Sequence, residues 1–188
     1  MSIFGGLPEK VCVGGEEFEI NTDFRVWIEI EQLIFNKRLT DAERLSGMIV
    51  LAMPEVPDTD VHALVSALLE FCFGDMTESK DCKGTHKKAL FDYDEDSEYI
   101  YSAFLAEFGI DLTTASLHWH KFKALLKSLS DDCKFSKIVG YRSTDTSKIK
   151  DKEQRRYYEK MKRIYSLPDR RTEDEKEADL AESLAVFF

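Results

Sequence analysis

Apolar side chains recur along most of the chain at the spacing of amphipathic helices, and the clearest stripe lies within residues 117–142. Its members stand at i, i+3, i+4 and i+7, and they are Phe122, Leu125, Leu126 and Leu129. Residues at this spacing share one face of an α-helix, which buries that face against a core. The lysines of the same helix fall off the stripe and are predicted to face water, namely Lys121, Lys123 and Lys127.

A second short helix is expected directly after this one. Ser130 or Asp131 can cap its start, because a short side-chain oxygen accepts from an unpaired backbone N–H there. Apolar residues repeat the helical spacing up to Gly140, where a helix often ends in a left-handed residue. We expect the polar run 141–147 to be a connection.

The first part of the chain predicts a β-hairpin followed by three helices. Alternating apolar residues flank Gly14 and Gly15, a pair that supplies the positive φ of tight hairpin turns. Thr22 and Asp23 offer a cap for the first helix, and residues 40–43 form a capping-box pattern for the second.

Residues 74–90 break the helical pattern, since they are polar, contain two glycines and show no periodicity. We expect a loop or linker there. Another helix follows, with acids enriched around its first turn as the helix dipole favours, and Gly109 stands at its expected end. Thr113 or Thr114 can cap the helix that begins near Leu117.

A strongly charged helix is expected from about residue 148 to residue 165. One of its faces carries apolar and aromatic residues, namely Tyr157, Met161, Ile164 and Tyr165. Pro168 stops this helix, and a capping box at 172–175 begins an acidic helix that ends in apolar residues. Such an apolar end can dock on the protein's own core or on a neighbour.

Together these patterns predict a mainly α fold, a bundle-like domain of about six to eight helices with an N-terminal β-hairpin. The predicted domain spans residues 1–167, and residues 168–188 form an acidic helix or tail beyond it. Its expected parts are the hairpin 10–21, a helical half 22–73, the loop 74–90 and a second helical half 91–167.

The net charge of −10 argues against general affinity for nucleic acid. Residues 91–116 hold seven acids and no base, whereas residues 117–163 hold 14 bases and six acids. Residues 166–188 are acidic again, with seven acids and three bases. Complementary patches of this kind can orient self-association. Solvated helix faces are the simpler interpretation of each run, including the basic helix with its tyrosines.

No residues form a recognisable catalytic or metal-binding pattern. His86 follows Cys82 at a spacing that suits half of a zinc site, but no second pair stands near it. His118 and His120 should point apart on a helix, with His118 packed in the core and His120 facing water. The acids at 92–98 lack the spacing of a calcium loop. We therefore expect neither an enzyme nor a metal or cofactor.

The chain also lacks the marks of membrane insertion or secretion. No apolar run approaches the roughly 18 residues of a membrane span, and the first ten residues do not form a signal-peptide pattern. The four cysteines are scattered without a CxxC pair, so we expect reduced thiols in a cytosol.

Several runs of residues are more specific than these patterns. They are residues 20–25, 91–93, 98–101, 108–112, 117–119, 121–122, 124–126, 138–142, 147–151 and 161–162, together with Asp96, Phe104, Phe135 and Tyr158. With these residues the chain resembles the bacteriophage Gp15 family over about residues 10–167. His120 departs from the pattern, where a second aromatic residue is expected after Trp119.

The resemblance implies a protein of the tail modules of siphophages and prophages of Gram-positive bacteria. Proteins encoded between the major tail protein and the tape-measure protein commonly act as tail assembly chaperones. The resemblance thus implies a helical protein of the host cytoplasm that solubilises the tape-measure protein before the tail tube forms. Its implied partners are the tape-measure protein, another tail assembly chaperone and further copies of itself.

The candidate client-binding residues lie on the charged helix and at the end of the acidic segment. They are Tyr157, Tyr158, Met161, Ile164, Tyr165, Phe187 and Phe188, with the loop 74–90 as a further candidate. They would receive an amphipathic helix of the client. Two alternatives stay open: a structural tail component retained in the virion, and a small metal- or nucleotide-dependent enzyme, which no motif supports.

Overall fold

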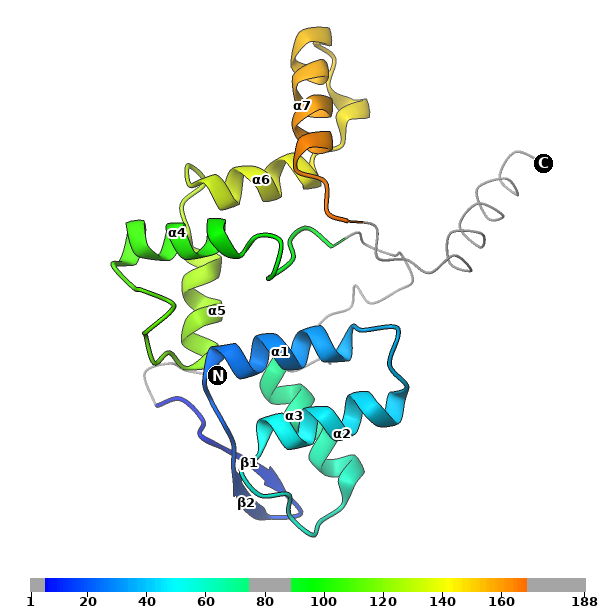
Figure 1. The fold of residues 1–188 in the computed structure, drawn as a ribbon, viewed down its shortest axis with the longest axis vertical. Coiled ribbons are helices and arrows are strands. Elements are labelled where there is room, and N and C mark those ends of the chain that lie inside the picture. The colour runs from blue at the N-terminus through cyan, green and yellow to red at the C-terminus, as the bar shows by residue number, and fades with distance from the viewer. Residues whose placement is uncertain (1–5, 75–88, 169–188) are drawn as a thin grey trace, which may run out of the picture.

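The computed structural model describes residues 6–74 and 89–168 (Figure 1). Its elements are β1 (Lys10–Val13), β2 (Glu16–Glu19), α1 (Phe24–Ile34), α2 (Asp41–Ala52), α3 (Val61–Phe73), α4 (Ser97–Phe108), α5 (Trp119–Ser128), α6 (Lys134–Ser143), the 3-10 helix η2 (Thr146–Lys148) and α7 (Lys152–Ile164). Across these described residues, seven α-helices and one hairpin confirm the predicted mainly α fold. None of the described helices is long and apolar enough to cross a membrane.

The β-hairpin forms where the alternating pattern and the glycine pair predict it. Strands β1 and β2 pair antiparallel, with Val13 opposite Glu16. Gly14 and Gly15 have φ angles of 62° and 90°, the left-handed region that a tight turn of this type requires. Val11 and Val13 are buried where β1 packs on α3, so the hairpin covers one side of that helix.

Short polar residues start the first three helices, as the sequence indicates. Asp23 caps α1 and Asp60 caps α3, while Thr40 and Glu43 form the expected capping box on α2. Each cap satisfies backbone N–H groups that have no partner inside the helix. Helices α1 and α2 run side by side, and α3 crosses beneath them (Figure 1).

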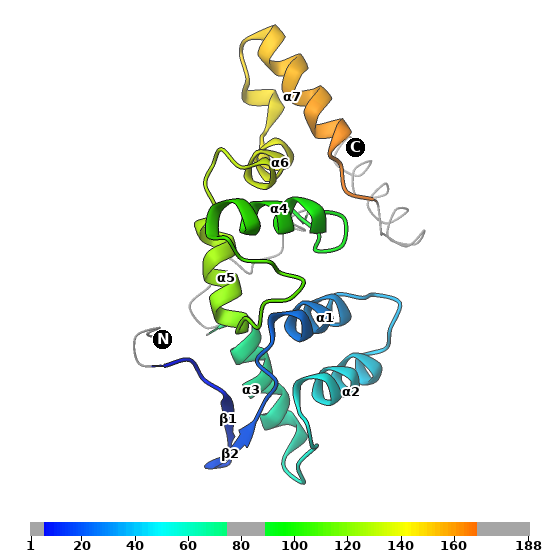
Figure 2. The same cartoon turned by 60° about the vertical axis from the view of Figure 1, so that its left-hand side comes forward.

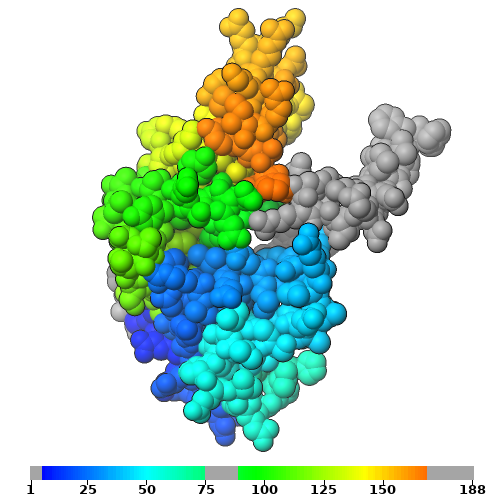
Figure 3. Space-filling model, viewed as in Figure 1, coloured from blue at the N-terminus to red at the C-terminus, as the bar shows by residue number. Residues whose placement is uncertain are grey.

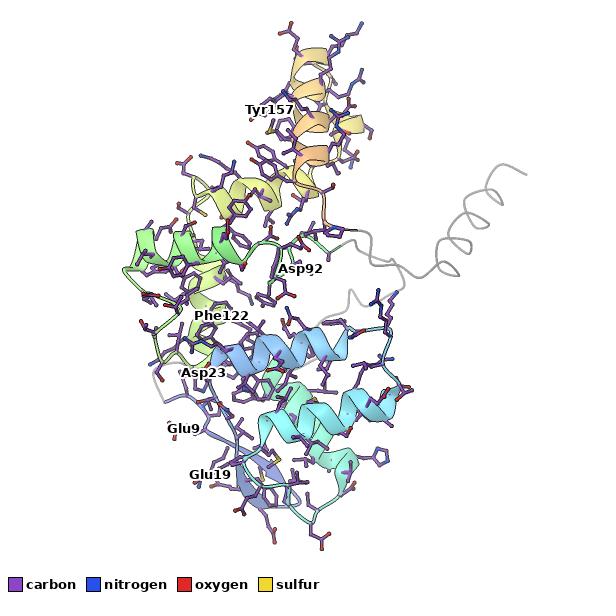
Figure 4. All side chains as sticks on the ribbon, viewed as in Figure 1. Glu9, Glu19, Asp23, Asp92, Phe122 and Tyr157 are labelled. Carbon is purple, nitrogen blue, oxygen red and sulfur yellow. The ribbon has the colours of Figure 1, made fainter. Side chains whose placement is uncertain are left out.

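Helix α5 connects the first three helices to the rest of the chain. It packs on both α1 and α4, and it stands between them in two views (Figures 1 and 2). Phe122 is fully buried, with its ring centroid 4.7 Å from that of Phe24 and 5.2 Å from that of Phe104 (Figure 4). Both ring pairs are stacked at 19°. One aromatic stack therefore joins α1, α5 and α4.

The first turn of α5 satisfies the last carbonyls of α3. The indole N–H of Trp119 donates to the Cys72 carbonyl at 3.0 Å, and His120 Nε2 donates to the Phe71 carbonyl at 2.8 Å. Lys123 Nζ also donates to the Cys72 carbonyl and lies 4.8 Å from the centroid of the Trp119 ring. These carbonyls have no partner within their own helix. The predictions that His120 and Lys123 face water are therefore wrong.

His118 has a different role from the one predicted. It caps α5, which neither Thr113 nor Thr114 does. Its Nδ1 accepts from the His120 backbone N–H at 3.0 Å, and its Nε2 donates to the Pro8 carbonyl at 3.0 Å. Both nitrogens are thus used, as expected of a satisfied histidine. The ring centroids of His118 and His120 are 5.2 Å apart, so the two rings do not point apart.

Helix α6 differs from its prediction at both ends. Cys133 caps its start, where Ser130 or Asp131 was expected. Gly140 lies inside the helix, which continues into the residues predicted to be a connection. Gly109, by contrast, ends α4 with a φ of 67°, as predicted. The turn after Gly140 stays helical because Arg142, which lies in it, is anchored by an ion pair with Asp96.

The central ring gives a direct test of this arrangement. Phe122→Ala leaves a cavity between Phe24 and Phe104, so we expect the free energy of unfolding to fall by about 3–5 kcal/mol in a urea titration. Phe35→Ala is the matched control, because Phe35 is 70% exposed, and we expect it to cost less than about 1 kcal/mol. Similar losses in both variants would contradict the central position of Phe122.

His120 should make stability depend on pH. Burial lowers its pKa below the usual 6.5, and its Nδ1 is buried without a hydrogen-bond partner, so a second proton finds no acceptor. The unfolded chain then binds the proton more readily, so this contribution to stability is present above about pH 6.5 and is lost as the pH falls. We expect His120→Gln to lose less stability than the wild type between about pH 7 and 5 in urea titrations. Equal losses would refute the assignment.

Candidate interaction surface on helices α6 and α7

Helix α7 projects from the rest of the molecule (Figures 1 and 3). It packs on α6 and on η2, and none of its 13 residues is fully buried. Residues 146–148 form η2, so α7 starts later than predicted, at a cap formed by Asp151. The helix carries six bases and two acids. A helix this polar is fixed by the residues of the face that packs on α6 and η2. Its remaining surface stays accessible to other interactions.

Four tyrosines gather where α7 meets α6. The ring centroid of Tyr141 lies 6.1 Å from that of Tyr157 and 5.9 Å from that of Tyr158. Tyr165 stacks on Tyr141 at 6.0 Å and 15°. The hydroxyls of Tyr141 and Tyr157 are 3.1 Å apart, and this hydrogen bond raises the pKa of Tyr141. The tyrosines are thus one aromatic contact between two helices.

Tyr141 lies within α6, whereas the sequence pattern predicts a connection there. The signal was present, because Tyr141 follows Ile138 by three residues and would share its face if the helix continued through Gly140. A glycine at this position instead predicts the end of a helix. In the structure it is an interior residue of α6, and Tyr141 becomes the residue on which the tyrosines of α7 pack.

Arg142 anchors the end of α7 to α4 and α6. Its guanidinium donates to both carboxylate oxygens of Asp96, at 2.6 and 2.9 Å, and Asp96 is fully buried. Arg142 also donates to the carbonyls of Tyr165 at 2.6 Å and Leu90 at 3.1 Å. Asp96 was predicted to match the helix dipole with the neighbouring acids. It is instead the buried partner of a residue 46 positions later.

A lysine holds Tyr165 from the side of α6. Lys134 Nζ donates to the Tyr165 hydroxyl at 2.5 Å and lies 4.6 Å from the centroid of the same ring. The hydrogen bond to Tyr165 raises the pKa of Lys134. Tyr165 is therefore fixed at its hydroxyl, its ring and its carbonyl, the last through Arg142.

The predicted client-binding residues separate into two groups in the structure. Tyr158, Met161 and Tyr165 are partly buried, whereas Tyr157 and Ile164 remain 49% and 55% exposed. We call the exposed pair the Tyr157–Ile164 edge; Tyr157 is labelled in Figure 4. Phe187 and Phe188 lie outside the described residues, as do residues 75–88 of the predicted loop.

Two buried titratable groups away from α6 and α7, Cys72 and Glu31, are part of the packed interior. Burial raises the pKa of the Cys72 thiol to about 12, so this sulfur stays protonated and is a poor nucleophile near neutral pH. Burial also raises the pKa of Glu31, whose carboxylate is hydrogen-bonded to Tyr93. Within residues 6–74 and 89–168, no group of three or more His, Cys, Asp or Glu side chains could hold a metal ion.

A family model described as Bacteriophage Gp15 protein matches residues 5–167, a range that contains every helix and strand of the structure. Searches of the curated proteins and of the solved structures returned no match.

The buried ion pair predicts a large effect of one substitution. Arg142→Ala leaves the Asp96 carboxylate buried without its cation, so we expect the free energy of unfolding to fall by about 3–5 kcal/mol. Lys148→Ala is the control, since Lys148 pairs with Asp145 but its side chain is 82% exposed. We expect that change to cost at most about 1 kcal/mol. Urea unfolding followed by circular dichroism distinguishes the two, and a mild Arg142→Ala phenotype would disprove the anchoring role.

Proposed function

The chain belongs to the bacteriophage Gp15 family, and we propose that it is a non-enzymatic tail assembly chaperone. In this role it binds the tape-measure protein and keeps it soluble during tail assembly in the host cytoplasm. The observation that carries the proposal furthest is the Tyr157–Ile164 edge, a half-exposed strip that borders the face by which the projecting helix α7 packs on α6.

The edge has the dimensions that a helical client requires. Tyr157 and Ile164 are seven residues apart, which is two turns or about 10 Å along the helix axis. Arg156, Lys160 and Arg163 stand beside them on the same helix. An amphipathic helix with apolar residues at i and i+7 and acids next to them fits this strip. A long helical client offers many such sites.

We propose that several copies act together on one client. The proposed partners are the tape-measure protein, further copies of this chain and another tail assembly chaperone. The acidic stretch 91–116 and the basic stretch 117–163 are complementary in charge, which favours contacts between copies. Binding many copies along one long helix raises the overall affinity without any new contact at each site.

The test is co-expression with a fragment of the tape-measure protein from the same phage or prophage. We expect the wild-type protein to co-purify with the fragment and to raise its soluble fraction. Tyr157→Ala/Ile164→Ser should abolish both effects while the protein stays folded, because both side chains are half-exposed and losing the Tyr157–Tyr141 hydrogen bond costs only about 1 kcal/mol.

The matched control lies on the other half of the molecule. Phe35→Ala/Val50→Ser also removes one aromatic and one β-branched side chain, which are 70% and 66% exposed. We expect this variant to bind the fragment like the wild type. If the wild-type protein neither co-purifies with the tape-measure fragment nor raises its soluble fraction, the chaperone proposal fails. Mass spectrometry of purified virions then tests the alternative of a structural tail component, which would be retained in the particle.

A further inference from the structure

The Tyr157–Ile164 edge is uncovered in the described residues, and its charge constrains what can cover it. The face of α7 that packs on α6 carries Tyr158, Met161 and Tyr165, and Tyr157 at its border also contacts Tyr141. Bases lie next to both members of the edge: Arg156 precedes Tyr157, Lys160 follows it by about one helical turn, and Arg163 precedes Ile164. An occupant should therefore be apolar along one line and acidic beside it.

Residues 172–188 of the same chain have this composition. They contain six acids and one base. The sequence predicts a helix that starts at the capping box 172–175. Leu180, Leu184 and Phe187 follow at i, i+4 and i+7, which places them on one helical face. Leu180 and Phe187 are as far apart in sequence as Tyr157 and Ile164, so the two apolar lines match in length.

The connection between the two segments is short enough to favour contact within one molecule. Helix α7 ends at Ile164, and seven residues, 165–171, join it to Thr172. Seven extended residues span at most about 25 Å, so the chain length limits how far Thr172 can lie from the end of α7. Two helices joined by a short loop pack antiparallel by preference, and a short linker gives an effective concentration of the order of millimolar.

We propose that residues 172–188 dock as an acidic amphipathic helix on the Tyr157–Ile164 edge of their own molecule. Leu180, Leu184 and Phe187 contact the edge, and the acids of the segment face the bases of α7. The segment therefore competes with the client for one site. This consequence, which rests on the proposed function, keeps the apolar edge covered until a client helix with a better match displaces the segment.

Hydrogen exchange measured by mass spectrometry on the full chain tests the docking without any client. We expect the peptide that spans the end of α7 to exchange at least about tenfold faster in Leu180→Ser/Leu184→Ser than in the wild type. Ala178→Ser/Ala185→Ser is the matched control, because these alanines fall on the opposite face of the predicted helix, and we expect no change. A peptide from α3 should be unaffected in both variants.

A second variant approaches the same contact from α7. Arg156→Glu/Lys160→Glu reverses the charge beside the edge, so it should release residues 172–188 and speed their exchange by a similar factor. In the wild type, protection should not depend on protein concentration, since the contact is within one molecule. Protection that grows with concentration would assign the occupant to a second copy and overturn the proposal.

Two further results would also overturn it: no protection of α7 in the wild type, or unchanged protection in Leu180→Ser/Leu184→Ser. Failure of the chaperone role is a separate outcome. In that case the wild-type protein does not co-purify with the tape-measure fragment, but hydrogen exchange still differs between the wild type and Leu180→Ser/Leu184→Ser. If both hold, Leu180→Ser/Leu184→Ser should bind the tape-measure fragment more tightly than the wild type does.

Discussion

The last carbonyls of α3 lie in the protein interior, and the donors that satisfy them determine how the chain is assembled. Trp119, His120 and Lys123 donate to the carbonyls of Phe71 and Cys72 from the first two turns of α5. A buried carbonyl without a donor costs roughly 1–3 kcal/mol, so α5 is held at the end of α3 by more than apolar burial. The lysine adds a positive charge at the negative end of the α3 dipole. These contacts fix both the position and the direction of α5.

The rest of the core follows from that placement. The backbone N–H of Phe24 donates to the Leu117 carbonyl at 3.0 Å, and the N–H of Trp119 donates to the Thr22 carbonyl at 2.8 Å, so the starts of α1 and α5 are tied together. Phe122 lies one turn further along and receives Phe24 on one side and Phe104 on the other. The helices before and after residues 75–88 therefore share one core. Helices α6 and α7 extend outward from it.

Local signals predicted the parts of the fold that depend on neighbours in sequence. Asp23, the Thr40 capping box and Gly109 behaved as expected, because a cap acts within one helical turn. His120 was mispredicted because its partner, Phe71, is 49 residues away, and no periodicity reports such a contact. The prediction that the helix ends at Gly140 was wrong for the same reason, because Arg142 beyond it binds the distant Asp96. The candidate surface was predictable only in part. The helical pattern identifies its residues on α7, whereas Tyr141 joins them only because α6 continues past Gly140.

Helix α7 carries a packed face and, beside it, a half-exposed edge, and this arrangement suits the proposed chaperone role, in which the client must be released. The packed side is held by Tyr141, Lys134 and the Arg142–Asp96 pair, so the exposed edge has a fixed orientation. The edge itself is formed by Tyr157 and Ile164, which cover far less than the roughly 800 Å² that each partner buries in a stable interface. One copy should then bind a client helix weakly, and many copies along the helix should bind it firmly. In the proposed role, a growing tail tube could displace these weak contacts one at a time without unfolding this protein, because no residue of the edge belongs to the core.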